Sequence, residues 1–340
     1  MKQHIKDYYA SPALDQTKLK LLLGNDPRKF LEPPVIDTQS TKLGSLVDCL
    51  VTDSVEFETD YYVTQLEVLP TDAVKSIIST YYDVIKEFPL LDNDTTLLKV
   101  ITDANYYNNL KPETKLAKVL ETGSEYLNDL KACGDRIIIT QADLTLAQTM
   151  VSNLQSTFPE ILMNTNPDIE VKYQVPIYET IRGIACKGLF DILIINHSEK
   201  KVKIIELKTF YGHPLEFSSA VHSHRYDIQL AFYKELYELS SEYLLDYQIE
   251  CYCLVSSSTY PEIPVLIQLT DELLKIGAVG RDAFTISASY CPELYIKMNE
   301  IEGFRDLLDK YKFYQEHGFN KDQRIVLDNS RFSMNWSGIV

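Results

Sequence analysis

Two carboxylates and one ammonium stand out in an apolar stretch of the chain. Residues 188–210 read GLFDILIINHSEKKVKIIELKTF, and they include Asp191, Glu206 and Lys208. Two strand-like segments flank the polar connection NHSEKK, which predicts a β-hairpin. A turn at the middle of that connection places Asp191 opposite Glu206, with the Cα atoms about 5 Å apart.

The hairpin residues admit two interpretations. Glu206 and Lys208 point to one face of a strand that is apolar on both faces, and such strands are usually buried. Burying these charges is costly unless they are paired or bind an ion. Lys208 could simply neutralise Glu206 in a structural ion pair. Alternatively, Asp191 and Glu206 hold Mg²⁺ or Mn²⁺, which prefer carboxylate oxygens, and Lys208 stands beside a scissile phosphate. That arrangement suits phosphodiester hydrolysis by a metal-activated water.

A tyrosine-rich helix is predicted downstream, over YDIQLAFYKELYEL. Gln229 and Tyr233 lie four residues apart on one face of it, and Tyr226 extends the stripe. Gln can bond a phosphate, and Tyr can contact the backbone or stack on a base. The other interpretation is an ordinary amphipathic helix. Beside the hairpin carboxylates, substrate positioning is favoured.

These motifs together resemble a known family. Asp191, followed by Glu206-Leu207-Lys208, resembles the core signature of the PD-(D/E)XK nuclease superfamily. Gln229 and Tyr233 match the Gln-x-x-x-Tyr motif of its RecB-like branch, which includes phage exonucleases of the RecE type. The segment from Lys187 to Asp191 is similar to the one that leads into that branch's metal-binding Asp.

The N-terminal part also looks RecE-like, through Tyr8, Ser11 and the segment 43–48, LGSLVD. The branch commonly has Gly-x-x-x-His there, with the His as a metal ligand. This chain has Asp48 at that position. A carboxylate can coordinate Mg²⁺ directly, so the resemblance implies Asp48 as a third ligand. A solvated Asp at the edge of a helix over residues 41–52 is the other interpretation.

The resemblance implies an α/β fold with a mixed, restriction-endonuclease-like sheet flanked by helices and a helical N-terminal elaboration. Residues 1–165 would form the mainly helical part that contributes Asp48, and residues 166–340 the nuclease core, unless the two are intertwined. The sequence further predicts a helix from Ser11 to Gly24, a loop over residues 211–225, and late helices near 271–287 and 299–317. The segment 136–140 reads as a strand or a linker.

The activity implied is a metal-dependent DNA nuclease, an exonuclease that processes DNA ends in recombination or repair. Catalytic roles fall to Asp191, Glu206 and Lys208, with Mg²⁺ or Mn²⁺ as cofactor. Further candidates to bind substrate are Gln229, Tyr233, Tyr226, Arg225 and Lys187. Two alternatives stay open: an endonuclease or junction-cleaving enzyme with the same site, and a degenerate member kept as a nucleic-acid-binding or assembly module. Related exonucleases are often ring-shaped oligomers, and a single-strand annealing or recombination protein is a candidate partner.

Composition and charge bear on the substrate, the cofactor and the compartment of the protein. The 340 residues carry a net charge of −16, which repels nucleic acid at long range. The window 182–225 nevertheless holds seven basic and four acidic residues, so a basic cleft in an acidic exterior is expected. The six cysteines form no Cys-x-x-Cys pair, which disfavours a zinc ribbon. With no signal-peptide core and no apolar run long enough for a membrane span, we expect a cytoplasmic protein of a bacterial or phage-infected cell.

Overall fold

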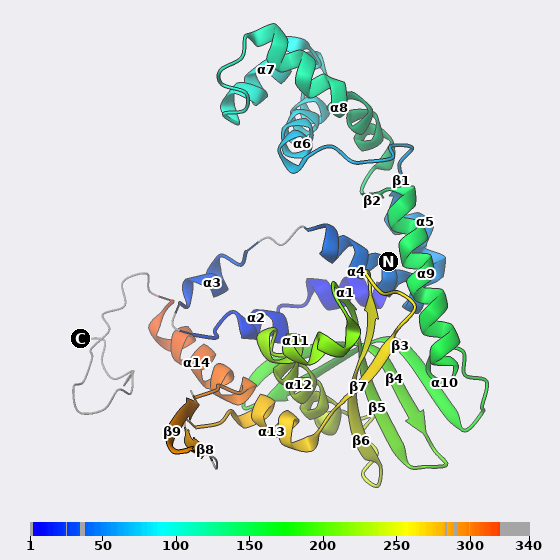
Figure 1. The fold of residues 1–340 in the computed structure, drawn as a ribbon, viewed down its shortest axis with the longest axis vertical. Coiled ribbons are helices and arrows are strands. Elements are labelled where there is room, and N and C mark those ends of the chain that lie inside the picture. Colours follow the sequence, from blue (N-terminus) through cyan, green and yellow to red (C-terminus); the bar gives the residue numbers. More distant parts are fainter. Residues whose placement is uncertain are drawn as a thin grey trace. The chain divides into compact units, whose positions relative to one another are not determined.

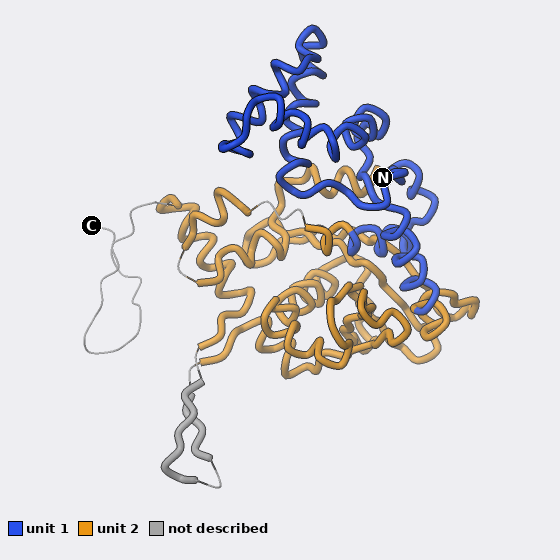
Figure 2. The backbone as a smooth tube through the Cα atoms, turned by 45° about the horizontal axis from the view of Figure 1, so that its top comes forward, with its two compact units in different colours: residues 1–2, 43–153 blue, residues 3–42, 154–340 orange. Residues whose placement is uncertain are grey.

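The computed structural model divides the chain into two compact units. It describes residues 3–24, 26–34, 38–282, 284–288, 291–298 and 300–319. One unit holds residues 1–2 and 43–153, and the other holds residues 3–42 and 154–340 (Figure 2). The N-terminal forty residues therefore belong to the unit that contains the hairpin. We call these the helical unit and the sheet unit.

The sheet unit is built on five strands in the order β3-β4-β5-β6-β7. Only the β5–β6 pair is parallel, and the other three neighbouring pairs are antiparallel. This mixed sheet confirms the predicted fold class. The strands are β3 (Ile169–Ile181), β4 (Ile184–Asn196), β5 (Lys201–Phe210), β6 (Gln248–Ser257) and β7 (Val265–Leu269).

Helix α12 (Tyr226–Leu239) connects the parallel strands β5 and β6 and packs against β3, β4, β5 and β6. Figure 1 shows it on one face of the sheet, with α11 (Phe217–Ser223) and α13 (Asp271–Val279) beside it. Its apolar stripe explains this position, because Ile228, Phe232 and Leu236 are fully buried in the main core.

The remaining elements of the sheet unit are short helices and one hairpin. Helices α2 and α14 contact each other and both contact α12, while α1 contacts β3. The bounds are α1 (Gln3–Ala10), α2 (Gln16–Lys20), α3 (Arg28–Leu31), α10 (Pro159–Leu162), η3 (Pro214–Glu216), α14 (Phe304–His317), β8 (Phe284–Ala288) and β9 (Cys291–Met298).

The helical unit has its own core, formed chiefly by the packed helices α6, α7 and α8. The segment 136–140 contributes a short strand, β2, which pairs in parallel with β1. The elements that lie wholly or mostly in this unit are α4 (Gln39–Thr52), η1 (Ser54–Glu56), α5 (Phe57–Asp60), β1 (Tyr61–Val63), α6 (Asp72–Glu87), η2 (Pro89–Leu91), α7 (Asp94–Asp103), α8 (Pro112–Cys133), β2 (Ile137–Ile139) and α9 (Gln141–Thr157). In the described part of the chain, no helix is both long enough and apolar enough to cross a membrane.

Three sequence expectations are wrong in detail. The helix expected from Ser11 begins only at Gln16, because Leu14 is extended and bridges to Cys186 of β4. The expected loop 211–225 contains η3 and α11, since Phe217, Ala220 and Val221 have core to pack against. The helix expected over 271–287 ends at Val279. Gly280 follows with φ +71°, and β8 begins at Phe284.

Candidate active site

Asp191 sits where two strands of the sheet part. The β4–β5 ladder pairs Ile192 with Ile205 and ends there, in the register predicted for the hairpin. Beyond that pair, Asp191 Oδ2 accepts the backbone N–H of Leu207 at 2.8 Å. A side-chain oxygen thus replaces the backbone acceptor that the diverging strand no longer supplies. This bond fixes the Asp191 carboxylate beside the strand that carries Glu206.

Glu206 is a buried carboxylate with one of its two oxygens paired. Its side chain is 8% exposed, and Oε1 accepts a hydrogen bond from Lys208 Nζ at 2.5 Å. Oε2 is buried without a hydrogen-bond partner among the described residues. An orphaned carboxylate oxygen in such a place is costly unless a cation or another donor meets it. The donor set therefore fits a hard divalent cation bound by Glu206 and Asp191.

Lys208 stays protonated in this environment. Burial acts to lower the pKa of Lys208, but the charges of Glu206 and Asp191 outweigh it and raise the pKa above its usual value. The ammonium also lies 5.0 Å from the ring centre of Tyr226. Lys208 is thus a cation that is hydrogen-bonded to Glu206, attracted by the charge of Asp191 and placed over the Tyr226 ring.

Gln229 and Tyr233 lie inside the core rather than on an open surface. They are 3% and 4% exposed, and Gln229 Nε2 donates to the Tyr233 hydroxyl at 3.3 Å. Burial raises the pKa of Tyr233 well above its usual value, with smaller contributions that include the charge of Glu206. The helix reaches β4 this closely because Gly188 has no side chain; an added Cβ would come within 2.7 Å of Leu236. The Tyr233 hydroxyl is therefore buried within electrostatic reach of Glu206 and Asp191.

Two basic residues predicted to bind substrate are engaged within the protein. Lys187 is 2% exposed, and its ammonium donates to the carbonyls of Tyr8 and Ser11 at 2.7 and 2.9 Å. It thereby fastens the N-terminal segment to β4. Arg225 grips the buried carboxylate of Asp227 through Nε and a terminal nitrogen, at 3.0 and 2.9 Å. Both side chains therefore stabilise the fold, Lys187 through backbone carbonyls and Arg225 through an ion pair.

Tyr226 and Lys20 complete the surroundings of Lys208. The Tyr226 ring stacks on Phe217 at 5.5 Å, and Lys20 Nζ lies 5.8 Å from the Tyr226 ring centre. Sequence reasoning missed Lys20, because nothing in QTKLK distinguishes it from Lys18. Only the packing of α2 against α12 reveals its place.

The predicted third metal ligand, Asp48, belongs to the helical unit and lies on α4. It is partly buried, and its backbone carbonyl accepts the hydroxyl of Thr52 at 2.8 Å. Across the residues that the structure describes, no three His, Cys, Asp or Glu side chains are grouped so as to hold a metal ion.

Comparison with known proteins gives little beyond this geometry. No family model and no curated protein matches the chain. Among solved structures, it is similar to a protein from Eubacterium rectale named "Putative exonuclease", with 13% identity and a TM-score of 0.42, over 81% of this chain and 80% of that one. A second, named SSO0001, has 12% identity and a TM-score of 0.22, over 71% and 84%. Likenesses this low carry no argument about function.

Proposed function

We propose that this chain is a DNA nuclease that depends on Mg²⁺ or Mn²⁺ and acts as an exonuclease on DNA ends in recombination or repair. The observation that carries the proposal is the hairpin site. Asp191 and Glu206 come from neighbouring strands, and Glu206 has a buried oxygen with no hydrogen-bond partner in the described structure. The sequence motifs that resemble the RecB-like branch add to it.

The residues of the chain divide the work. Asp191 and Glu206 would hold the cation, Asp191 being oriented by the Leu207 N–H and Glu206 by Lys208. When bound, such an ion lowers the pKa of water and neutralises phosphate charge. Lys208, protonated throughout the neutral range, stabilises the charge that develops on the phosphate. Gln229 and Tyr233, predicted to position substrate, are buried, so a role in that task would have to act through the residues that cover them. Asp48 is proposed as an additional ligand.

The test is cleavage of linear and circular DNA with Mg²⁺ or Mn²⁺, each repeated with EDTA. We expect degradation of linear DNA that EDTA abolishes and that Glu206→Gln removes. The Gln side chain keeps the shape and an acceptor for Lys208 but loses the charge that the cation needs. Glu199→Ala is the matched control, because Glu199 lies exposed in the turn of the same hairpin. Wild-type rates in Glu206→Gln would refute the site assignment.

The same experiment separates the two alternatives. Cleavage of circular DNA at a rate similar to that of linear DNA identifies an endonuclease, and preference for branched substrates a junction-cleaving enzyme. DNA binding without cleavage under any divalent cation identifies a degenerate binding or assembly module. The net charge of −16 and Asp48 in place of the His that is common in the RecB-like branch favour that last alternative.

The setting of the activity is also a proposal. Four free cysteines, at positions 133, 186, 251 and 253, are buried as small apolar side chains, which suits a reducing compartment, so we propose the cytoplasm of a bacterial or phage-infected cell. The family resemblance suggests a homo-oligomer and a single-strand annealing or recombination protein as partner. Light scattering of the purified chain, and co-purification with such a protein from infected cells, would test these two points.

A further inference from the structure

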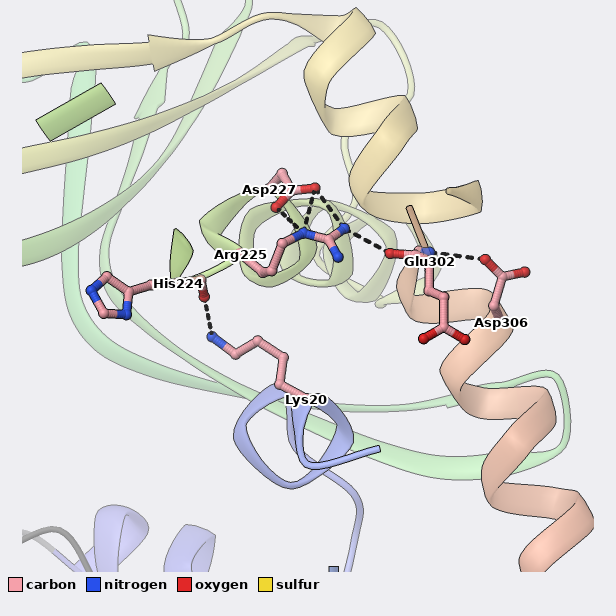
Figure 3. Close-up of polar contacts among 7 residues, drawn as sticks. Lys20, His224, Arg225, Asp227, Glu302 and Asp306 are labelled. Atoms are coloured by element: carbon pink, nitrogen blue, oxygen red, sulfur yellow. Dashed lines mark hydrogen bonds and ion pairs between the residues drawn. The ribbon is translucent and has the colours of Figure 1, made fainter. Parts of the chain in front are cut away.

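Lys20 reaches from α2 toward the residues that surround Lys208. Its ammonium donates to the backbone carbonyl of His224 at 3.2 Å, as Figure 3 shows, and lies 5.8 Å from the ring centre of Tyr226. Lys208 Nζ lies 5.0 Å from the same ring centre. Two ammonium groups from distant parts of the chain therefore converge on one aromatic ring beside a carboxylate site.

The turn that receives Lys20 is held in an unusual shape. Arg225 has φ +53°, a left-handed conformation that is costly for a residue with a side chain. Its guanidinium is clamped by Asp227 and by the carbonyl of Glu302 at 2.7 Å (Figure 3). These contacts over-determine the turn, and the turn presents the His224 carbonyl to Lys20.

Helix α2, which carries Lys20, is itself held in place by a capping residue, a buried leucine and backbone hydrogen bonds. Asp15 caps its first turn by accepting the N–H of Lys18 at 2.8 Å, and Leu19 is fully buried. Just before the helix, Leu14 exchanges two backbone hydrogen bonds with β4, through Ala185 and Lys187. The strand that carries Asp191 thus positions α2 directly.

The neighbouring cations and burial disfavour the charged form of Lys20, and a bound anion would oppose this effect. Burial, followed by repulsion from Lys208, lowers the pKa of Lys20 to about 8. Glu206 and Asp227 act to raise it, and Arg225 acts to lower it. A phosphate placed between the two ammonium groups would relieve their mutual repulsion and favour the charged form of Lys20.

We propose that Lys20 is a catalytic residue that supplies a second ammonium to the phosphodiester on which Lys208 acts. The assignment rests on the proposed nuclease function and extends it to a residue outside the hairpin and α12. The arrangement uses two cations of different kinds. Lys208 is hydrogen-bonded to the Glu206 carboxylate, whereas Lys20 donates to the neutral carbonyl of His224 and pairs with no carboxylate among the described residues, so its charge is available for the substrate.

The test compares Lys20→Met with Lys18→Met, which changes an exposed lysine on the same helix. Affinity for a fluorescent duplex is measured with Ca²⁺, and cleavage in single turnover with Mg²⁺. We expect Lys20→Met to slow cleavage of bound DNA at least tenfold, with the Kd changed less than threefold. Lys18→Met should stay within twofold of wild type in both measurements.

The pH profile separates a catalytic role from a structural one. With enzyme and DNA both well below KM, the rate follows kcat/KM, whose pH dependence reports the pKa values of the free enzyme. We expect the wild-type rate to fall above about pH 8, where Lys20 loses its proton, and this decline to be absent in Lys20→Met. Lys20→Arg should retain most of the activity and also lose the decline.

Three results would overturn the role of Lys20. These are a wild-type rate in Lys20→Met, equal losses of rate and affinity with an unchanged pH profile, and a decline above pH 8 that persists in Lys20→Arg. Lys20→Arg alone decides the matter if Lys20→Met does not fold. A wild-type chain that cleaves no DNA refutes the nuclease proposal itself, whereas a cleaving chain that is indifferent to Lys20 refutes only this inference.

Discussion

Asp191 Oδ2 accepts the backbone N–H of Leu207 at 2.8 Å, although the ladder between their two strands has already ended at Ile192 and Ile205. One carboxylate thus completes the hydrogen bonding of a strand that leaves its partner, and the residue that it binds follows Glu206 directly in the chain. Asp191 is thus both a hydrogen-bond acceptor that stabilises the fold and a proposed metal ligand, and suitable substitutions should separate these two roles.

Asp191→Ala should lower the free energy of unfolding and abolish cleavage. The Leu207 N–H would lose its acceptor in a largely buried place, at a cost of about 1–3 kcal/mol. Asp191→Asn keeps an acceptor oxygen, so its urea midpoint should stay near that of wild type while cleavage is still lost. Equal destabilisation by both substitutions would show that the charge of Asp191, rather than its hydrogen bond, stabilises the fold.

Lys208→Ala should reduce cleavage roughly a hundredfold while the Kd for DNA changes little. One ammonium among several basic groups contributes little to total phosphate attraction, but at the reacting phosphate it acts where charge develops. Lys203→Ala, on the same strand, is the control for simple loss of a charge. Equal losses in binding and rate would make Lys208 a mere phosphate contact, and loss of folding would leave only the structural ion pair with Glu206.

The ion pair of Arg225 and Asp227 should prove structural. Arg225→Ala leaves a buried, unpaired carboxylate and should cost roughly 3–5 kcal/mol in urea unfolding. Adding Asp227→Asn removes that charge and should recover a large part of the loss. If Arg225 chiefly binds substrate, Arg225→Ala would instead weaken DNA binding and leave the urea midpoint unmoved.

Lys20 should also make the free energy of unfolding depend on pH. Its pKa in the folded protein, about 8, lies below the usual value of 10.5, so the fold disfavours its charged form. Between about pH 8 and pH 10.5, Lys20 is therefore protonated more often in the unfolded chain than in the folded one. The contribution of Lys20 to the free energy of unfolding rises as the pH increases through this range. The difference in unfolding free energy between wild type and Lys20→Met should change by at most about 3 kcal/mol over this window. A constant difference would contradict the lowered pKa.

Asp48 is tested by the metal dependence of cleavage. If Asp48 is a ligand, Asp48→Ala should raise the Mn²⁺ concentration needed for half-maximal activity. Asp48→His, which provides the ligand type common in the RecB-like branch, should keep substantial activity with Mn²⁺ preferred over Mg²⁺. A titration curve that Asp48→Ala leaves unmoved would restrict the site to the hairpin carboxylates.

The hairpin could be predicted because its signals are local. Two apolar segments on either side of a short polar turn predicted the register that the β4–β5 ladder has, up to the pair of Ile192 and Ile205. The strands of the mixed sheet and α12 followed from similar patterns. Within the candidate site, however, the sequence could not show that the Lys187 ammonium donates hydrogen bonds to two backbone carbonyls and is not available to a substrate.

What the sequence could not reveal depends on long-range contacts. Leu14 is extended because it bridges to Cys186, more than 170 residues away, so the helix begins later than its capping signals suggest. Segment 211–225 forms helices because the core covers its apolar side chains. Lys20 comes near Lys208 through the packing of α2 against α12 and through its hydrogen bond to the His224 carbonyl, just before Arg225, whose left-handed backbone has no signature in the sequence.

The most direct test of the metal site is a crystal of the chain soaked in Mn²⁺, with anomalous diffraction recorded near the manganese edge. We predict a peak within coordination distance of both Asp191 and Glu206, close to the orphaned Oε2 atom, and its disappearance in Glu206→Gln. A soaked crystal with manganese bound elsewhere and no peak at these two carboxylates would contradict the account.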